Sequence, residues 1–275
     1  MEVKIAPPDR STALGKTGWL AALLFGFVAI ASAHAEWRVT SSRVEKSPNE
    51  SLIYRQTLLE DRASGTHATL DCAVFETKAA TIETIDQPDS SGRQDLAKAM
   101  AQRGALAGVN GGYFDPQDAP VGLLVSDGKI LSPLRKAKLL AGVLFATRDK
   151  IGITRASGFV MSKSVRSAVQ CGPLLVERSA PIAGLDHARA ARRTFAAVDG
   201  RGHAALGVSS AVSLANLGQI LALTNVLGEV KPVRALNLDG GSSSGFWFAG
   251  EQRVISIPEF KPVRDFVAVV SRENR

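Results

Sequence analysis

The sequence predicts a single α+β domain with a mixed β-sheet and a few packed helices. Three observations lead to this expectation. Many short apolar segments lie between turn signals, only two stretches have helical periodicity, and no linker or change of composition divides the chain after residue 35. Hydrophobic residues make up 45% and charged residues 21% of the 275 positions, which is typical of globular proteins and argues against a disordered or collagen-like chain.

The first part of the expected domain contains strands and one helix. Alternation of apolar and polar residues predicts strands at 37–44, 52–59 and 67–75, and a turn-rich loop follows at 86–92. A helix is expected at 94–103, where apolar residues recur at helical spacing. Gly104 is its natural end, because glycine readily adopts the left-handed conformation of a C-cap.

The second part is dominated by short strands. Turn residues at 126–128, 148–150 and 199–202 separate pairs of apolar segments and predict hairpins. A second helix is expected at 214–226, with Gly228 after it. The remaining strands are expected at 105–109, 121–125, 129–131, 141–146, 151–154, 174–177, 194–198, 204–208, 235–238 and 266–270.

The first 35 residues are interpreted as a cleaved signal peptide. Three basic residues precede an uncharged stretch at 17–35, which ends in Ala33-His34-Ala35, a small-x-small cleavage pattern. Cleavage after Ala35 would give a periplasmic or secreted protein without a stable membrane span. The alternative is an uncleaved N-terminal anchor, since 19 uncharged residues could just cross a bilayer. We divide the rest into residues 36–104, the N-terminal strands and helix, and 105–275, the catalytic region of the same domain.

Charge and the numbers of cysteines and histidines bear on the expected partners, disulfide and metal sites. The net charge of +7 is scattered, without the basic run of a nucleic-acid-binding patch, so no nucleic acid partner is expected. A site for an anionic substrate and an ordinary basic exported protein both fit this charge. Cys72 and Cys171 could form one disulfide in an oxidising compartment, or remain two buried thiols. The few, widely separated histidines argue against a structural zinc site.

Two loops share a pattern that indicates a binding site. Asn110-Gly111-Gly112 and Asp239-Gly240-Gly241 each follow an apolar strand and place a polar side chain just before paired glycines. Paired glycines let backbone N–H groups approach an anion such as phosphate, and the flanking side chains could act as acid, base or hydrogen-bonding group. For either loop alone, a tight turn is the simpler interpretation. A dinucleotide site is disfavoured, because no helix directly follows either loop.

Four ordered motifs carry a family resemblance. They are Asn110-Gly-Gly-Tyr-Phe-Asp, Gln170-Cys-Gly-Pro-Leu-Leu-Val, Arg193-Thr194 and Asn237-Leu-Asp-Gly-Gly-Ser-Ser-Ser. The set resembles the phosphodiester glycosidase family over roughly residues 105–270. The resemblance implies an exported hydrolase that cleaves a sugar-1-phosphodiester, in a glycan or an envelope polymer, between the anomeric carbon and the phosphate oxygen. No cofactor is expected, although a divalent metal stays open.

The resemblance also assigns roles to individual residues. Asp239 is expected to act as general base or to stabilise the oxocarbenium ion, Arg193 to hold the phosphate with its planar fork, and Asn110 to complete the catalytic set. Substrate binding is expected from a larger group, namely Gly111, Gly112, Tyr113, Gln170, Gly172, Thr194, Gly240, Gly241 and Ser242.

Two other functions stay open from the sequence. One is a non-catalytic glycan-binding or envelope protein on the same fold. The other is a metal-dependent phosphodiesterase that cleaves on the other side of the phosphorus, although the sequence has no cluster of metal ligands. A carboxylate at a strand end, beside a potential anion nest, favours the glycosidase.

Overall fold

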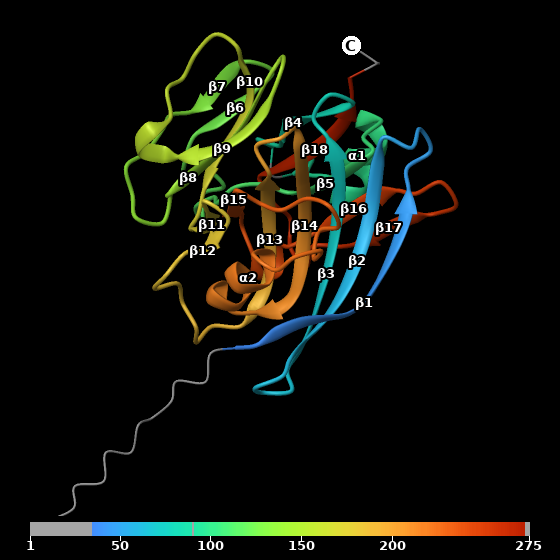
Figure 1. Ribbon diagram of the computed structural model, residues 1–275. Coiled ribbons are helices and arrows are strands. Elements are labelled where there is room, and N and C mark those ends of the chain that lie inside the picture. The colour runs from blue at the N-terminus through green and yellow to red at the C-terminus, as the bar shows by residue number, and fades with distance from the viewer. Residues whose placement is uncertain (1–34, 90, 273–275) are drawn as a thin grey trace, which may run out of the picture. The chain divides into compact units, whose positions relative to one another are not determined.

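Three antiparallel sheets make up most of the computed structural model, which describes residues 35–89 and 91–272 (Figure 1). The expected signal peptide lies outside the described residues, except for Ala35. The first sheet has eight strands in the order β1-β2-β3-β14-β13-β15-β11-β12. Their bounds are β1 Trp37–Lys46, β2 Leu52–Asp61, β3 His67–Glu76, β14 His203–Val212, β13 Ala191–Val198, β15 Arg234–Asn237, β11 Leu174–Glu177 and β12 Ala180–Pro181.

The other two sheets have five strands each. The second sheet, in the order β7-β6-β10-β8-β9, contains β7 Lys129–Ser132, β6 Leu124–Ser126, β10 Val165–Cys171, β8 Gly142–Thr147 and β9 Ile151–Arg155. The third sheet, in the order β17-β16-β5-β18-β4, contains β17 Val254–Ile257, β16 Phe246–Ala249, β5 Ala107–Asn110, β18 Asp265–Ser271 and β4 Ala80–Asp86.

The described helices are few and short. They are the α-helices α1 (Leu96–Arg103) and α2 (Leu214–Leu221), with 3-10 turns η1 (Ala156–Gly158) and η2 (Gly241–Ser243). Gly104 caps α1 with a φ of 63°, as the sequence predicts. Helix α2 ends five residues earlier than predicted, and Asn225 then adopts a left-handed φ of 64°. No described helix is long and apolar enough to cross a membrane.

The predicted fold class is therefore only partly right. The domain is mostly β, and each strand pair in the described residues is antiparallel, for example β13 with β15 and β5 with β18, so the predicted mixed sheet is wrong. Antiparallel strands need only short connections, whereas parallel strands need a crossover of a dozen or more residues, usually a helix. With two short α-helices in the described chain, hairpins and short loops supply most connections.

The core lies where the three sheets meet. Its main cluster includes Leu206 of the first sheet, Val169 of the second and Val267 of the third, all at most 2% exposed. A second cluster packs α2 against the opposite face of the eight-stranded sheet, and a third packs α1 against β16 and β18. The sheets thus fix the relative positions of strand ends that are far apart in the sequence.

The two cysteines are free and buried, so of the two alternatives the structure shows buried thiols and not a disulfide. Cys72 belongs to the cluster that packs against α2, whereas Cys171 belongs to the cluster between the sheets. Successive side chains of a strand point to opposite faces, and this alternation directs Cys72 of β3 and Cys171 of β10 into different clusters. Burial raises the pKa of Cys72 to about 12 and also raises that of Cys171, so both remain neutral thiols.

Candidate functional site

The two Gly-Gly loops predicted from the sequence lie against each other. Asn110 ends β5, and Asp239 follows β15 by two residues. The Asp239 N–H donates to the carbonyl of Gly111 at 3.0 Å, and the Asn110 side-chain amide donates to the carbonyl of Asp239 at 2.7 Å. The ends of strands from two different sheets therefore form one polar cluster.

Asn110 and Thr194 form the buried base of this cluster. The Asn110 Oδ1 accepts hydrogen bonds from the Thr194 hydroxyl at 2.6 Å and from the Gly245 N–H at 3.1 Å. The Thr194 hydroxyl also lies 3.1 Å from the Ser244 hydroxyl. Both side chains are fully buried, so they hold the two loops together from the interior of the protein.

The glycines of the first loop are needed for close packing. A Cβ on Gly111 would lie 1.8 Å from Asp265 Oδ1, and one on Gly112 would lie 2.9 Å from Val169 Cγ1. The N–H groups of Gly111 and Gly112 both donate to Asp265, to its carbonyl and its side chain respectively. Both N–H groups thus have protein acceptors in this structure, and anion binding by them stays a prediction.

The second loop has a different geometry. Gly240 donates its N–H to the Asp239 carboxylate at 2.9 Å. Gly241, with a φ of +67°, begins the 3-10 turn η2 and has open space around its Cα, and Ser242 is exposed. The Ser242 carbonyl accepts a hydrogen bond from the Phe260 N–H at 2.8 Å, which ties this loop to the segment before β18.

Asp239 is a half-buried carboxylate in a mixed electrostatic environment. Burial raises its pKa above the ordinary value for an aspartate. The Ser243 hydroxyl, the Gly240 N–H and the charge of Lys261 lower it and offset part of that rise. The Lys261 Nζ lies 5.1 Å from the centre of the Phe114 ring, in a cation–π contact beside the site.

Tyr113 connects this region to the second motif. Its hydroxyl donates to the Gly172 carbonyl at 2.5 Å and accepts from the Asn237 side-chain amide at 3.1 Å. Burial raises its pKa above the ordinary value, and the negative charge of Asp239 raises it further. Tyr113 is therefore a neutral phenol that fixes Gly172 and Asn237 beside Asp239.

Arg193 is a largely buried cation without a carboxylate partner. Its Nε donates to the Val212 carbonyl at 3.1 Å, and Nη2 donates to the Arg189 carbonyl at 2.6 Å. No ion pair within 4.0 Å joins it to any carboxylate among the described residues. Burial and the charge of Arg189 lower its pKa. Its Cδ lies 3.8 Å from the position of a Cβ on Gly240, which places it beside the second loop.

Gln170 is engaged entirely with backbone groups. Its Oε1 accepts from the N–H groups of Leu123 and Arg135, both at 3.0 Å, and its Nε2 donates to the carbonyls of Arg135 and Leu140 at 2.7 and 3.0 Å. These four bonds use the full capacity of the amide. Gln170 thus holds the loop that follows β7, and it is not free to bind a sugar hydroxyl.

Sequence reasoning missed several residues of the cluster. Asn237 and Ser244 lie within the fourth motif and could have been chosen from it. Arg192, which donates to the carbonyls of Ser244 and Pro258 and lies 4.6 Å from the Phe260 ring centre, directly precedes the third motif. Asp265 had no such signal, because it stands in no glycine-rich motif.

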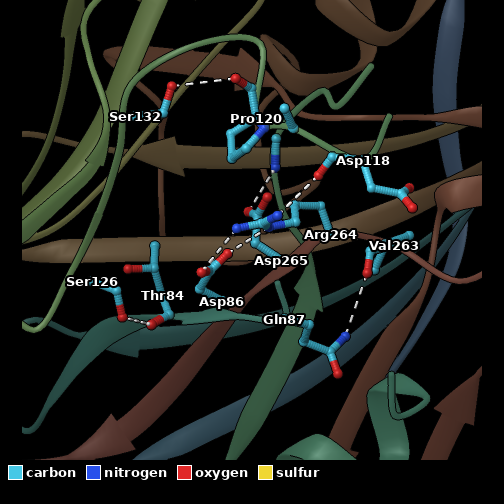
Figure 2. Close-up of polar contacts among 12 residues, drawn as sticks. Thr84, Asp86, Gln87, Asp118, Pro120, Ser126, Ser132, Val263, Arg264 and Asp265 are labelled. Atoms are coloured by element: carbon cyan, nitrogen blue, oxygen red, sulfur yellow. Dashed lines mark hydrogen bonds and ion pairs between the residues drawn. The ribbon is translucent and has the colours of Figure 1, made fainter. Parts of the chain in front are cut away.

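Asp265 belongs to a polar network behind the first loop. Figure 2 shows Arg264 between Asp86 and Asp118, with Asp265 next to it. Arg264 donates to both carboxylate oxygens of Asp86, at 2.7 and 3.0 Å, and to the Asp118 carbonyl at 3.0 Å. Burial, together with the charges of Asp86 and Asp239, raises the pKa of Asp265 to about 7 against the opposing Gly112 N–H and Arg264. The part of the chain that the structure describes contains no cluster of three or more His, Cys, Asp or Glu suited to a metal ion.

Comparison with known proteins identifies the class of this domain. The family model for phosphodiester glycosidase matches residues 103–270, which is more than half of the chain. The chain belongs to the phosphodiester glycosidase family. The four motifs and the contacts between Asn110, Thr194 and Asp239 lie within the matched range.

Two solved structures share the fold, and one curated protein matches part of the sequence. The fold is similar to the catalytic domain of zebrafish N-acetylglucosamine-1-phosphodiester alpha-N-acetylglucosaminidase, which was crystallised auto-inhibited by its pro-peptide: the TM-score is 0.61 at 15% identity, covering 84% of this chain and 88% of that one. A hypothetical protein from Synechocystis matches with a TM-score of 0.57 at 14% identity, covering 81% and 62%. The Escherichia coli protein YigE is 35% identical over 89 residues, 30% of this chain and 35% of YigE's length.

Proposed function

We propose that this protein hydrolyses the bond between the anomeric carbon of a sugar and a phosphodiester oxygen, in a glycan or an envelope polymer. The observation that carries the proposal is the half-buried Asp239 carboxylate at a strand end, with the charge of Lys261 acting on it and the Arg193 side chain beside the adjoining Gly240. Neither cation forms an ion pair with a carboxylate among the described residues. Such cations are suited to an anionic ligand, and such a carboxylate to a developing positive charge.

The chemistry follows from these groups. A water molecule forms a bond to the anomeric carbon as the bond from that carbon to the phosphate oxygen breaks, and the phosphate leaves with the electron pair. Asp239 accepts the proton of the water, a role that its raised pKa favours. The leaving group is already an anion, so it needs charge stabilisation from Arg193 and Lys261 more than it needs a proton donor.

The buried residues are assigned supporting roles. Asn110 and Thr194 position the Asp239 loop, because the Thr194 hydroxyl donates to the Asn110 side chain and the Asn110 amide donates to the Asp239 carbonyl. Gln170 and Gly172 position Tyr113 and the loop after β7. Ser242 and Gly241, at the exposed turn, are left to contact the substrate directly.

We also infer that the protein acts outside the cytoplasm. The expected signal peptide over residues 1–35 supports this, as does a fold match with a TM-score of 0.50 to a putative exported protein of Burkholderia pseudomallei. The N-terminal sequence of the protein isolated from its native cell envelope tests it, and Glu36 is the expected first residue.

The decisive test follows the oxygen of the attacking water. The chain starting at Glu36 is incubated with sugar-1-(methyl phosphate) diesters in ¹⁸O-labelled water, and the products are analysed by mass spectrometry. Cleavage at the anomeric carbon places the label in the released sugar. A label in the phosphate would show cleavage on the other side of the phosphorus and contradict the glycosidase proposal. No product from a broad panel of such diesters would favour the glycan-binding alternative.

A further inference from the structure

The segment 129–139, which contains β7 and the loop after it, combines positive charge with exposed apolar side chains. Ile130 and Leu139 are each 55% exposed, Leu131 is 44% and Leu134 is 40% exposed. These four stand among thirteen exposed large hydrophobic side chains in the described residues, so the segment holds far more than its share. Its cations are Lys129, Arg135, Lys136 and Lys138, and it contains no acidic residue.

The backbone of this segment is fixed, so its apolar side chains are held outside. Gln170 binds the backbone of Arg135 and Leu140. The Ser132 hydroxyl donates to the Pro120 carbonyl at 3.2 Å, which is drawn in Figure 2. These four hydrogen bonds fix the backbone of the segment. The exposed leucines therefore cannot move into the core without breaking them. Exposed apolar side chains gathered in one short segment favour an interaction surface.

The segment adjoins the candidate site. The Leu139 carbonyl lies 2.5 Å from the position of a Cβ on Gly172, and the Gly172 carbonyl accepts the Tyr113 hydroxyl. Val121, 37% exposed, donates its N–H to the Tyr113 carbonyl from the other side. Asp115 and Asp118 of the neighbouring loop are already engaged, with backbone N–H groups and with Arg93 respectively. Among the described residues, none of the four cations of the segment forms an ion pair with a carboxylate.

We propose that the segment 129–139 docks on the surface of an anionic lipid bilayer. Leucine and isoleucine side chains would enter the boundary between headgroups and acyl chains, while the four cations meet the anionic headgroups. The combination of charge and exposed apolar side chains favours a bilayer over a soluble polyanion, which would need the cations alone. Docking there would bring the Tyr113 side of the site close to the membrane surface. This inference does not depend on the proposed function.

The test is co-sedimentation of the chain starting at Glu36 with lipid vesicles; this chain corresponds to the compact unit of the structure. Vesicles of phosphatidylcholine with about one third phosphatidylglycerol should bind the protein, and vesicles of phosphatidylcholine alone should bind it much more weakly. Added salt should weaken binding without abolishing it, because the apolar contacts remain.

A matched pair of variants identifies the surface. Lys138→Gln/Leu139→Ser should reduce vesicle partitioning about 10-fold, from the loss of one cation and one inserted side chain. Arg253→Gln/Val254→Ser removes the same chemistry on β17, where Val254 is 56% exposed, and should leave partitioning unchanged. Melting temperatures of both variants check that the fold is retained.

Two further variants distinguish the other occupants. Leu134→Ser/Leu139→Ser should also lose binding; if it binds as the parent does, the surface recognises polyanions and the proposal is overturned. Sedimentation velocity should show a monomer in the absence of vesicles. A dimer that Leu134→Ser/Leu139→Ser dissociates would mean that a second copy covers the surface, and would equally overturn the proposal.

Discussion

Arg193 near the start of β13 and Arg264 just before β18 are both largely shielded from water. Their hydrogen-bond partners differ. Arg264 meets the Asp86 carboxylate with two hydrogen bonds and the Asp118 carbonyl with a third, so its charge is neutralised within the protein. Arg193 donates only to the carbonyls of Val212 and Arg189. A shielded cation that the fold does not neutralise has a desolvation cost, which an anionic ligand would offset.

The two aspartates on either side of the Gly111-Gly112 loop differ in the same way. Asp265 is fully buried and its Oδ1 accepts the Gly112 N–H, which makes it part of the loop's support. Asp239 is half exposed and its Oδ1 accepts the N–H of its own neighbour Gly240. The comparison indicates that the Arg264 network, meaning Asp86, Asp118, Arg264 and Asp265, supports the fold. It is consistent with our proposal that Asp239 and Arg193 act on a substrate.

The largest effect should come from Asp239→Asn, which keeps the shape of the side chain but removes its charge. We expect turnover to fall about 10²–10⁴-fold, the scale of a lost base or charge-stabilising group. Steady-state kinetics on a sugar-1-phosphodiester measure it, with melting temperature as the control for folding. Asp115→Asn, whose parent carboxylate accepts two backbone N–H groups, should stay near the parent turnover. Near-parental turnover of folded Asp239→Asn would contradict the assignment.

The next effect should appear in stability. Arg264→Met leaves the Asp86 carboxylate without its cation in a shielded position, so the free energy of unfolding should fall by about 3 kcal/mol. Urea unfolding curves measure this change. The double variant Arg264→Met/Asp86→Leu should recover part of the loss, because it removes the unpaired charge as well. Equal stability of Arg264→Met and the parent would show that the network is not a structural element.

Arg193→Lys should reverse that pattern. The variant keeps the positive charge but loses the planar guanidinium, whose Nε and Nη2 are held by backbone carbonyls. We therefore expect kcat/KM to fall about 10–100-fold, with both kcat and KM affected. The free energy of unfolding should change by less than about 1 kcal/mol. Arg189→Lys, at an exposed neighbouring position, is the matched control. A loss of stability as large as that of Arg264→Met, with kcat/KM unchanged for the folded fraction, would remove the distinction between the two arginines.

Local signals in the sequence explain which parts of the fold were predictable. Strands bounded by turns, such as Ile151–Arg155, and the Gly104 cap of α1 depend on neighbouring residues, and they were predicted nearly at their observed bounds. Strand β4 was not predicted. It buries Thr81, Glu83 and Thr84 as well as Ile82, so neither alternation nor an apolar run reveals it.

The site was predictable only where motifs carry it. The two Gly-Gly loops were correctly expected as one region, because each ends an apolar strand. The state of the glycine N–H groups could not be predicted, since their acceptor, Asp265, lies 153 residues after Gly112. That contact depends on β5 pairing with β18, which is a tertiary feature. The surroundings of Gln170 likewise depend on where the loop after β7 passes, and the sequence contains no local sign of this.

The smallest effect should be a change in the pH dependence of stability. The folded pKa of Asp265, about 7, lies well above the value of 3.8 for a free aspartate, so the folded state holds a proton that the unfolded state releases between these values. Stability contributed by this group is therefore complete below about pH 4 and is lost as the pH rises through 7. Burial and the charges of Asp86 and Asp239 raise this pKa, while the Gly112 N–H and Arg264 oppose them.

Asp265→Asn removes this titration and keeps an oxygen for the Gly112 N–H. Its melting temperature relative to the parent should rise between pH 5 and pH 8, because only the parent must ionise a buried group over that range. Melting curves of both proteins at the two pH values give this double difference, in which the titration of Asp239 and all other shared groups cancels. Parallel melting profiles would mean that Asp265 is already ionised at pH 5. Asp265 would then be a charged partner of Arg264. Asp265 and Asp239 would both be ionised, and their protonation state would no longer distinguish the Arg264 network from the candidate site.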